Sequence, residues 1–304
     1  MQSLINRLIF TILFFSVIGV QSYANNPSED TLNTHRLRKV LISQSAFYLA
    51  GISFLQFIWY KDHEPAPFHF YNDNKGWLQL DKAGHAFSTY YESYKVYKAL
   101  RWAGLSDNKS IIYGGLTGML IQAPIEIFDG YYEGYGFSKG DIVANTSGAI
   151  LFMGQQWILH EQIIKMKFSY SPSPYAKHRP RMLGENHIQR FFMDYNGHTY
   201  WLSLNLNSAT RIDNIPSWLN LAFGYSGNGM LGEFENPTWY RGEPFPYFER
   251  YRQYLFSLDI DLTKVKTSSR FLRSVFDAMN LVKIPLPTLE YNRLDGYKLH
   301  AVYF

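Results

Sequence analysis

Three pairs of polar residues stand in otherwise uncharged stretches of the first half of this chain. The pairs are Asp81 with His85, Glu126 with Asp129, and Asp141 with Asn145. Residues three or four apart lie on one side of a helix, so the members of each pair face the same way. An unpaired carboxylate is costly among apolar side chains, and we therefore expect the three pairs to face one another in one polar network.

Two kinds of chemistry are open to such a network. Imidazole and carboxylate groups together form an ordinary ligand set for a divalent metal, the one cofactor that these residues suggest. The predicted metal ligands are His85, Glu126, Asp129 and Asp141. Alternatively, His85 acts as a general base that Asp81 or Glu126 orients, which makes these three the candidate catalytic residues.

A purely structural interpretation of the same residues stays open. Asp81 and Asp141 each stand where a helix is expected to begin, and both could serve as N-caps. His85 would then be a hydrogen-bonded core histidine with Glu126 as its partner.

A second cluster of residues is basic. Lys177, Arg179 and Arg181 could bind lipid headgroups, or could form a solvated connector. The chain contains no nucleophile elbow, phosphate loop, dinucleotide fingerprint or HExxH motif. Its 29 basic and 25 acidic residues are too evenly balanced to indicate a nucleic-acid partner.

The N-terminus predicts export. Residues 1–24 have one charged side chain, Arg7, then an apolar run, and they end in Ser22-Tyr23-Ala24, as a signal peptide does. An uncleaved anchor is the alternative. The chain has no cysteine, which excludes disulfides, thiolate metal sites, cysteine nucleophiles and acylation of a lipoprotein cysteine. We expect a periplasmic or membrane-associated protein of the cell envelope.

Residues 34–167 have a helical pattern. Helices are expected over 40–60, 81–102, 110–128 and 141–165. The first has 21 residues and no charge, which is enough to span a bilayer, although a buried central helix would look the same. Only 18% of the chain is charged and three helical runs are uncharged, which favours a four-helix, membrane-associated module.

The remaining residues predict a linker and a β-rich domain. Prolines and basic residues mark a linker over 168–190, and residues 191–304 form the second domain. Apolar and polar residues alternate over 199–207, 217–225 and 253–262, a helical pattern covers 268–282, and a last strand is expected over 297–304. The fold class is thus α+β. The terminal Phe304 suggests an outer-membrane barrel, but four or five strands cannot close one, and Lys298 and His300 interrupt the outward apolar row.

Four blocks of sequence resemble the YfiM-like family of exported bacterial proteins, whose members are often labelled predicted periplasmic lipoproteins. They are Asp81-Lys82-Ala83-Gly84-His85, Gly114-Gly115-Leu116-Thr117-Gly118, Glu126-Ile127-Phe128-Asp129-Gly130 and Gly136-Phe137-Ser138-Lys139-Gly140-Asp141. The arrangement is also similar, more loosely, to VanZ-like membrane proteins, and residues 175–184, 194–202 and 218–231 look like an extension found in Bacteroidetes members.

This resemblance implies an envelope location and selects the same polar residues, but it implies no reaction. Without a cysteine to acylate, any anchoring must come from the helices. We therefore expect an envelope protein with a non-enzymatic binding or structural role at the membrane, whose partner is membrane lipid or an envelope component. The alternative is a metal- or histidine-dependent hydrolase that acts on lipid or cell-wall material.

Overall fold

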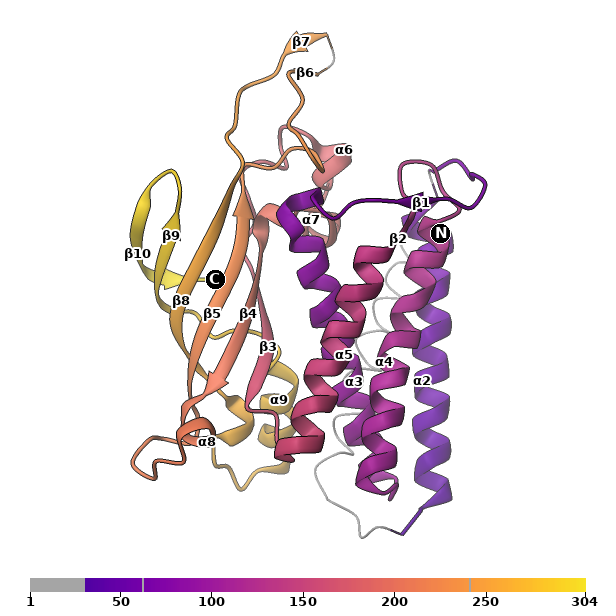
Figure 1. The fold of residues 1–304 in the computed structure, drawn as a ribbon, viewed down its shortest axis with the longest axis vertical. Helices are drawn as coiled ribbons and strands as arrows, with labels where there is room; N and C mark the ends of the chain where they lie inside the picture. Colours follow the sequence, from indigo (N-terminus) through magenta and orange to yellow (C-terminus); the bar gives the residue numbers. More distant parts are fainter. Residues whose placement is uncertain (1–30, 62, 241) are drawn as a thin grey trace. The chain divides into compact units, whose positions relative to one another are not determined.

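The computed structural model describes residues 31–304 except 62 and 241, so the expected signal peptide lies outside the described residues. The described chain is α+β, with helices in its N-terminal half and a sheet in its C-terminal half, which confirms the expected fold class at that level. It forms two compact units (Figure 1). The helical unit contains α2, α4, α5, α9 and most of α3, and the sheet unit contains the main sheet and the first turns of α3.

The long helices lie close to where the sequence pattern predicts them. They are α2 (Thr34–Phe54), which continues into a π-helical turn over Leu55–Trp59, α3 (Leu80–Trp102), α4 (Asp107–Asp129) and α5 (Lys139–Leu159). The expected helix over 141–165 is too long at its C-terminal end. His160 adopts a left-handed conformation with φ 54°, which ends α5, and the chain then enters a strand.

Glycines on α4 let its backbone approach α3 closely. A Cβ atom at Gly118 would lie 2.9 Å from both the backbone nitrogen of Ser93 and the carbonyl oxygen of Thr89. Elsewhere in the helical unit, Val40 of α2 packs with Val96, Leu100 and other buried residues of α3. Close packing through small residues therefore holds the helices together, as the Gly114 and Gly118 spacing indicates.

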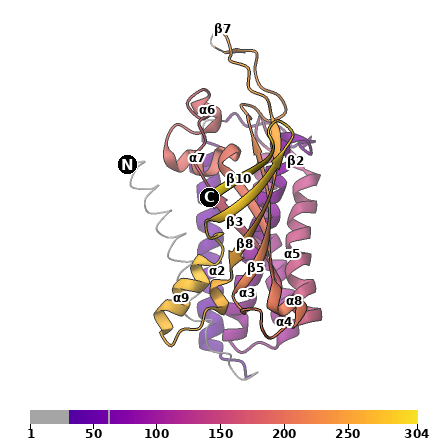
Figure 2. The same ribbon diagram turned by 90° about the vertical axis from the view of Figure 1, so that its left-hand side faces the viewer.

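The sheet unit is built on one six-stranded antiparallel sheet in the order β10-β9-β8-β5-β4-β3. Its strands are β3 (Ile164–Tyr170), β4 (His198–Asn205), β5 (Leu219–Asn228), β8 (Tyr251–Ile260), β9 (Leu286–Asn292) and β10 (Gly296–Tyr303). Figure 2 shows the β9–β10 hairpin crossing the other strands obliquely, so the sheet is strongly twisted.

The alternating segments over 199–207, 217–225, 253–262 and 297–304 form β4, β5, β8 and β10, with ends that shift by a few residues. Strands β3 and β9 were not expected, because Lys165 and Lys167 interrupt the apolar pattern of the first and Pro287 and Glu290 that of the second. The expected helix over 268–282 is shorter and forms α9 (Arg270–Met279).

Short elements connect these parts. They are β1 (Phe70–Tyr71), β2 (Phe137–Ser138), α6 (Pro180–Leu183), α7 (His187–Met193), α8 (Leu206–Thr210), β6 (Trp239–Tyr240) and β7 (Glu243–Pro244). The segment expected as a linker over 168–190 thus holds the end of β3, helix α6 and the start of α7.

Candidate functional site

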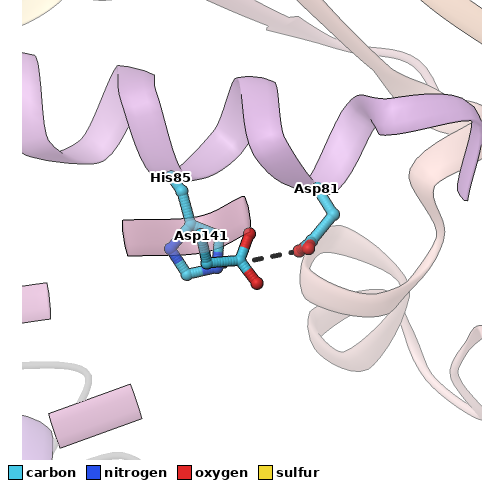
Figure 3. A group of neighbouring side chains, drawn as sticks. All are labelled: Asp81, His85 and Asp141. Atoms are coloured by element: carbon cyan, nitrogen blue, oxygen red, sulfur yellow. Dashed lines mark ion pairs between the residues drawn. The ribbon is translucent and has the colours of Figure 1, made fainter. Parts of the chain in front are cut away.

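Asp81 and His85 lie one turn apart at the beginning of α3 and form an ion pair (Figure 3). Nε2 of His85 is 3.8 Å from Oδ1 of Asp81. The same Oδ1 atom accepts a hydrogen bond from the Tyr195 hydroxyl at 2.7 Å, and Oδ2 is 3.0 Å from Nζ of Lys82. Asp81 is therefore held by three partners, which fix its side chain beside the imidazole.

An unusual turn places Asp81 where it is. Trp77, Leu78 and Gln79, directly before α3, all have positive φ angles, between 45° and 66°. Their surroundings hold them in this conformation: the carbonyl of Leu78 accepts a hydrogen bond from the Tyr225 hydroxyl, and Gln79 Oε1 accepts one from Arg252 at 2.7 Å. Such a run of left-handed residues costs free energy and persists only when its neighbours enforce it.

Asp141, on the first turn of α5, completes a group of three potential metal ligands. On α3 and α5, Thr89 Oγ1 donates to Oδ1 of Asn145 at 3.0 Å, and His85 and Asp141 each lie one turn before these residues. One ligand atom from each of Asp81, His85 and Asp141 lies within 4.8 Å of the others, and Figure 3 shows the three side chains pointing toward one another.

The first turn of α5 is capped by Ser138 and not by Asp141. Ser138 Oγ accepts a hydrogen bond from the backbone nitrogen of Asp141 at 3.1 Å, so Asp141 stands in the first helical turn. The proposed N-cap role for Asp141 is therefore wrong. The spacing of Ser138 and Asp141 is the sequence signal that would have identified the cap.

Glu126 and Asp129, predicted in the same metal set, do not belong to this group of three. Glu126 is fully buried, and its Oε2 accepts a hydrogen bond from the backbone nitrogen of Ser138 at 3.3 Å. Asp129 accepts a hydrogen bond from the hydroxyl of Tyr60, whose ring stacks on Tyr132 at 4.5 Å. These contacts give Glu126 a role in holding the start of α5 and tie Asp129 to an aromatic cluster.

The predicted headgroup-binding residues have different surroundings. Arg179 donates to the carbonyl of Leu231 and lies 5.8 Å from the ring of Tyr240, so its guanidinium group is bound within the protein. Lys177 and Arg181 are exposed. Only the latter two are placed to meet a ligand from solvent.

All six residues of the predicted polar network lie within one family match. Residues 69–153 match the family described as Predicted periplasmic lipoprotein (DUF2279). No curated protein and no solved structure matches the chain. The match supports an uncharacterised cell-envelope protein and confirms the predicted localisation, exported and periplasmic or membrane-associated.

Proposed function

We propose that this protein is an envelope protein whose helices α2 to α5 form a four-helix module inserted in a bilayer, with a non-enzymatic binding or structural role toward membrane lipid or another envelope component. The observation that carries this proposal is the apolar surface of the helical unit. An envelope location is also what the sequence resemblance implies, both to YfiM-like and VanZ-like proteins and to the extension of Bacteroidetes members.

Large apolar side chains on three helices of this unit are exposed. They include Leu41, Ile42, Leu49 and Phe57 of the first helical segment, Leu116 and Leu120 of α4, and Val143, Ile150 and Ile158 of α5. Leu120 is 64% exposed and Ile158 is 78% exposed. A helix of a soluble protein turns its apolar stripe inward and exposes its polar side chains, and these helices do the opposite.

Length and composition agree with insertion. The segments Thr34–Phe57 and Asp107–Asp129 are long and apolar enough to cross a membrane, and only 11% and 39% of their most apolar windows are buried. A core helix or a signal sequence can have the same length and composition, but a core helix would be mostly buried.

Several buried polar side chains of the helical unit bond to one another. Besides the Thr89–Asn145 pair, Gln156 Nε2 donates to the Tyr97 hydroxyl at 3.0 Å, and Gln162 Nε2 donates to Gln156 Oε1 at 3.1 Å. Hydrogen bonds of this kind satisfy polar groups where water is absent. The exposed Lys177 and Arg181 could add headgroup contacts.

Extraction of membranes tests the proposal. The full chain should stay in the pellet at high salt and at carbonate pH, and the double variant Leu120→Glu/Ile158→Glu should shift a large fraction into the soluble phase. Tyr247→Glu, which changes an 87% exposed side chain of the sheet unit, is the matched control. Complete release of the unchanged protein by carbonate would refute membrane insertion.

A second candidate is the metal- or histidine-dependent hydrolase that acts on lipid or cell-wall material. The specific observation in its favour is the group formed by Asp81, His85 and Asp141. Metal analysis of the purified protein should find about one divalent ion per chain, and His85→Ala and Asp141→Ala should lose it. Asp129→Asn lies outside the group and should keep it. Equal metal content in all four proteins, with folding intact, would exclude a metal site at this group, and retained in-cell function of His85→Ala would exclude the histidine-dependent form.

A further inference from the structure

The register of the main sheet aligns like residues in rows across its strands. One row consists of tyrosines on five neighbouring strands: Tyr200, Tyr225, Tyr254, Tyr291 and Tyr297. The next row on the same face is Leu202, Phe223, Phe256, Leu289 and Leu299, and a third contains Leu204, Leu221 and Leu258. We name these three rows the outer apolar face.

Most of the outer apolar face is exposed. Phe223 is 50% exposed and Leu299 is 76% exposed, and Leu202, Phe256, Leu258 and Leu289 are also exposed. Within the sheet unit, Leu80 and Phe87 of the first turns of α3 pack beside Tyr200, which is buried. The row of tyrosines is therefore covered at its β4 end and open from β8 to β10.

The opposite face of the sheet is buried and mixed. It carries an apolar cluster of Trp201, Ala222 and Leu255 beside polar residues that are at most 3% exposed: Ser203, Ser257, Asp259, Thr288 and Glu290. The polar residues bond to one another and to neighbours: Ser203 Oγ donates to Asp259 at 2.7 Å, and Gln253 Nε2 donates to Glu290 at 2.7 Å. A sheet in water exposes its more polar face. Here the exposed face is the wholly apolar and aromatic one, as in sheets that face lipid.

We propose that the outer apolar face contacts the hydrocarbon of a lipid bilayer, with the row of tyrosines at the level of the headgroups. Tyrosine gathers at this level because its ring is apolar and its hydroxyl is polar. Below the tyrosines, three pairs of residues on β5 and β8, from Phe223–Phe256 to Leu219–Ile260, form the apolar band. At about 3.3 Å per residue it is about 13 Å long, close to the thickness of one hydrocarbon leaflet, about 15 Å.

The distribution of charge fits this occupant. No residue of the three rows is charged. Past the row of tyrosines, Arg252 donates to the Tyr225 hydroxyl at 3.0 Å, and the exposed Arg293 pairs with Glu249 at 2.7 Å. Positive side chains at this position complement the phosphates of lipid headgroups.

Lys298 and His300, expected to interrupt the apolar row of β10, do not lie in it. They pair in register with Glu290 and Thr288 on the polar face, and Nε2 of His300 is 2.6 Å from Oε2 of Glu290. Tyr297 and Leu299 point the other way. The objection to a lipid-facing sheet that rested on these two residues is therefore wrong.

Contact with lipid also requires hydrogen-bond partners for the backbone N–H and C=O groups at the two edges of the sheet. At the β3 edge, the backbone nitrogen of Phe168 donates to Leu281 and its carbonyl accepts from Lys283, both at 2.9 Å. At the other edge, the end of β10 curls across the polar face, where the Tyr303 ring lies 6.0 Å from that of Trp201. The β3 edge is thus partly covered by the chain itself, and the β10 edge bends away from the outer apolar face at its C-terminal end.

Because the chain has no cysteine, single-cysteine variants test the proposal directly. Leu299→Cys, Phe256→Cys and the control Tyr247→Cys would each carry an environment-sensitive fluorophore, in the full chain reconstituted into vesicles of phosphatidylethanolamine and phosphatidylglycerol. Lipids with a mid-chain nitroxide should quench the first two labels, and aqueous iodide should quench them several-fold less than the control. A label at Tyr297→Cys should respond best to a nitroxide at headgroup level.

Two outcomes would overturn the proposal. Iodide quenching at Leu299 and Phe256 equal to that of the control would place the face in water, and quenching by neither agent would show that protein, such as a second copy, covers it. A label at Leu120→Cys reports on the helical unit in the same vesicles. Lipid quenching there without quenching at Leu299 would refute this inference and leave the proposed function standing.

Discussion

Nζ of Lys167 lies 2.7 Å from Oδ2 of Asp259 on the polar face of the sheet, and neither side chain is exposed to solvent. Lys167 also donates to the carbonyl of Ile260 at 2.7 Å, and Asp259 accepts from Ser203. A buried charge that loses its partner retains the cost of desolvation without the compensating attraction. The pair therefore has a strong effect on stability when one member is removed.

Asp259→Asn should lower the free energy of unfolding by about 3–5 kcal/mol, because it removes the carboxylate 2.7 Å from the buried Lys167, whose attraction offsets the cost of burying that charge. Thermal unfolding in detergent, followed by circular dichroism, measures the change. The control is Glu249→Gln, which removes a 2.7 Å ion pair with Arg293 at the surface and should cost about 1 kcal/mol or less. Equal losses from the two variants would contradict this account.

His198 should make stability depend on pH. Burial lowers the pKa of its imidazole to about 4, although a hydrogen bond to the carbonyl of Phe191 at 2.8 Å acts in the opposite direction. The unfolded chain takes up this proton near pH 6.5, so stability is complete above that pH and falls as the pH drops toward 4. The loss is about 3 kcal/mol at most.

His198→Gln should remove this part of the pH dependence, measured as the midpoint of unfolding between pH 4 and 7. His187→Gln, at an exposed position, is the control and should leave the profile unchanged. A His198→Gln profile that coincides with that of the unchanged protein would show that His198 does not cause the slope.

Two glycines of the helical unit should respond in opposite directions to alanine. A Cβ atom at Gly118 would lie 2.9 Å from backbone atoms of α3, whereas one at Gly154 of α5 would meet nothing within 4 Å. We expect Gly118→Ala to destabilise by about 1–3 kcal/mol through overpacking. Gly154→Ala should stabilise by up to about 1 kcal/mol through helix propensity. Thermal unfolding of both variants checks the sign, and equal signs would contradict the close packing of α3 and α4.

The end of α5 offers a stabilising change. His160 is exposed and has a φ of 54°, which glycine adopts without steric cost. His160→Gly should therefore stabilise by about 0.5–1 kcal/mol. Leu159→Gly, one residue earlier and inside the helix, should destabilise by about the same amount. Unfolding midpoints compare the two, and a loss of stability in His160→Gly would show that the imidazole makes a contact that outweighs its backbone strain.

Spacing along a helix predicted part of the candidate site. Asp81 with His85 and Asp141 with Asn145 are four apart, and each pair lies on one side of its helix. The hydrogen bond of Tyr195 to Asp81 spans 114 residues of sequence, so no local pattern could have indicated it. Glu126 and Asp129, three apart, take separate roles because their partners, the backbone of Ser138 and the hydroxyl of Tyr60, come from other segments of the chain.

The alternation of apolar and polar residues predicted most strands, but it did not predict which face of the sheet is buried. The period of two in β4, β5 and β8 separates the residues into two faces, and this pattern is the same for a sheet in water and a sheet in lipid. The usual inference places Leu202, Phe223 and Phe256 inside. The structure instead buries Ser203 and Asp259, and only the three-dimensional register reveals the exchange.

The outer apolar face also bears on the stability of the sheet unit. Folding in water buries Trp201 and Leu255 but leaves Phe223, Phe256 and Leu299 exposed, so the latter add little hydrophobic free energy to the folded state. Contact with lipid would remove them from water. We therefore expect the sheet unit to unfold at a higher temperature in lipid vesicles than in buffer alone.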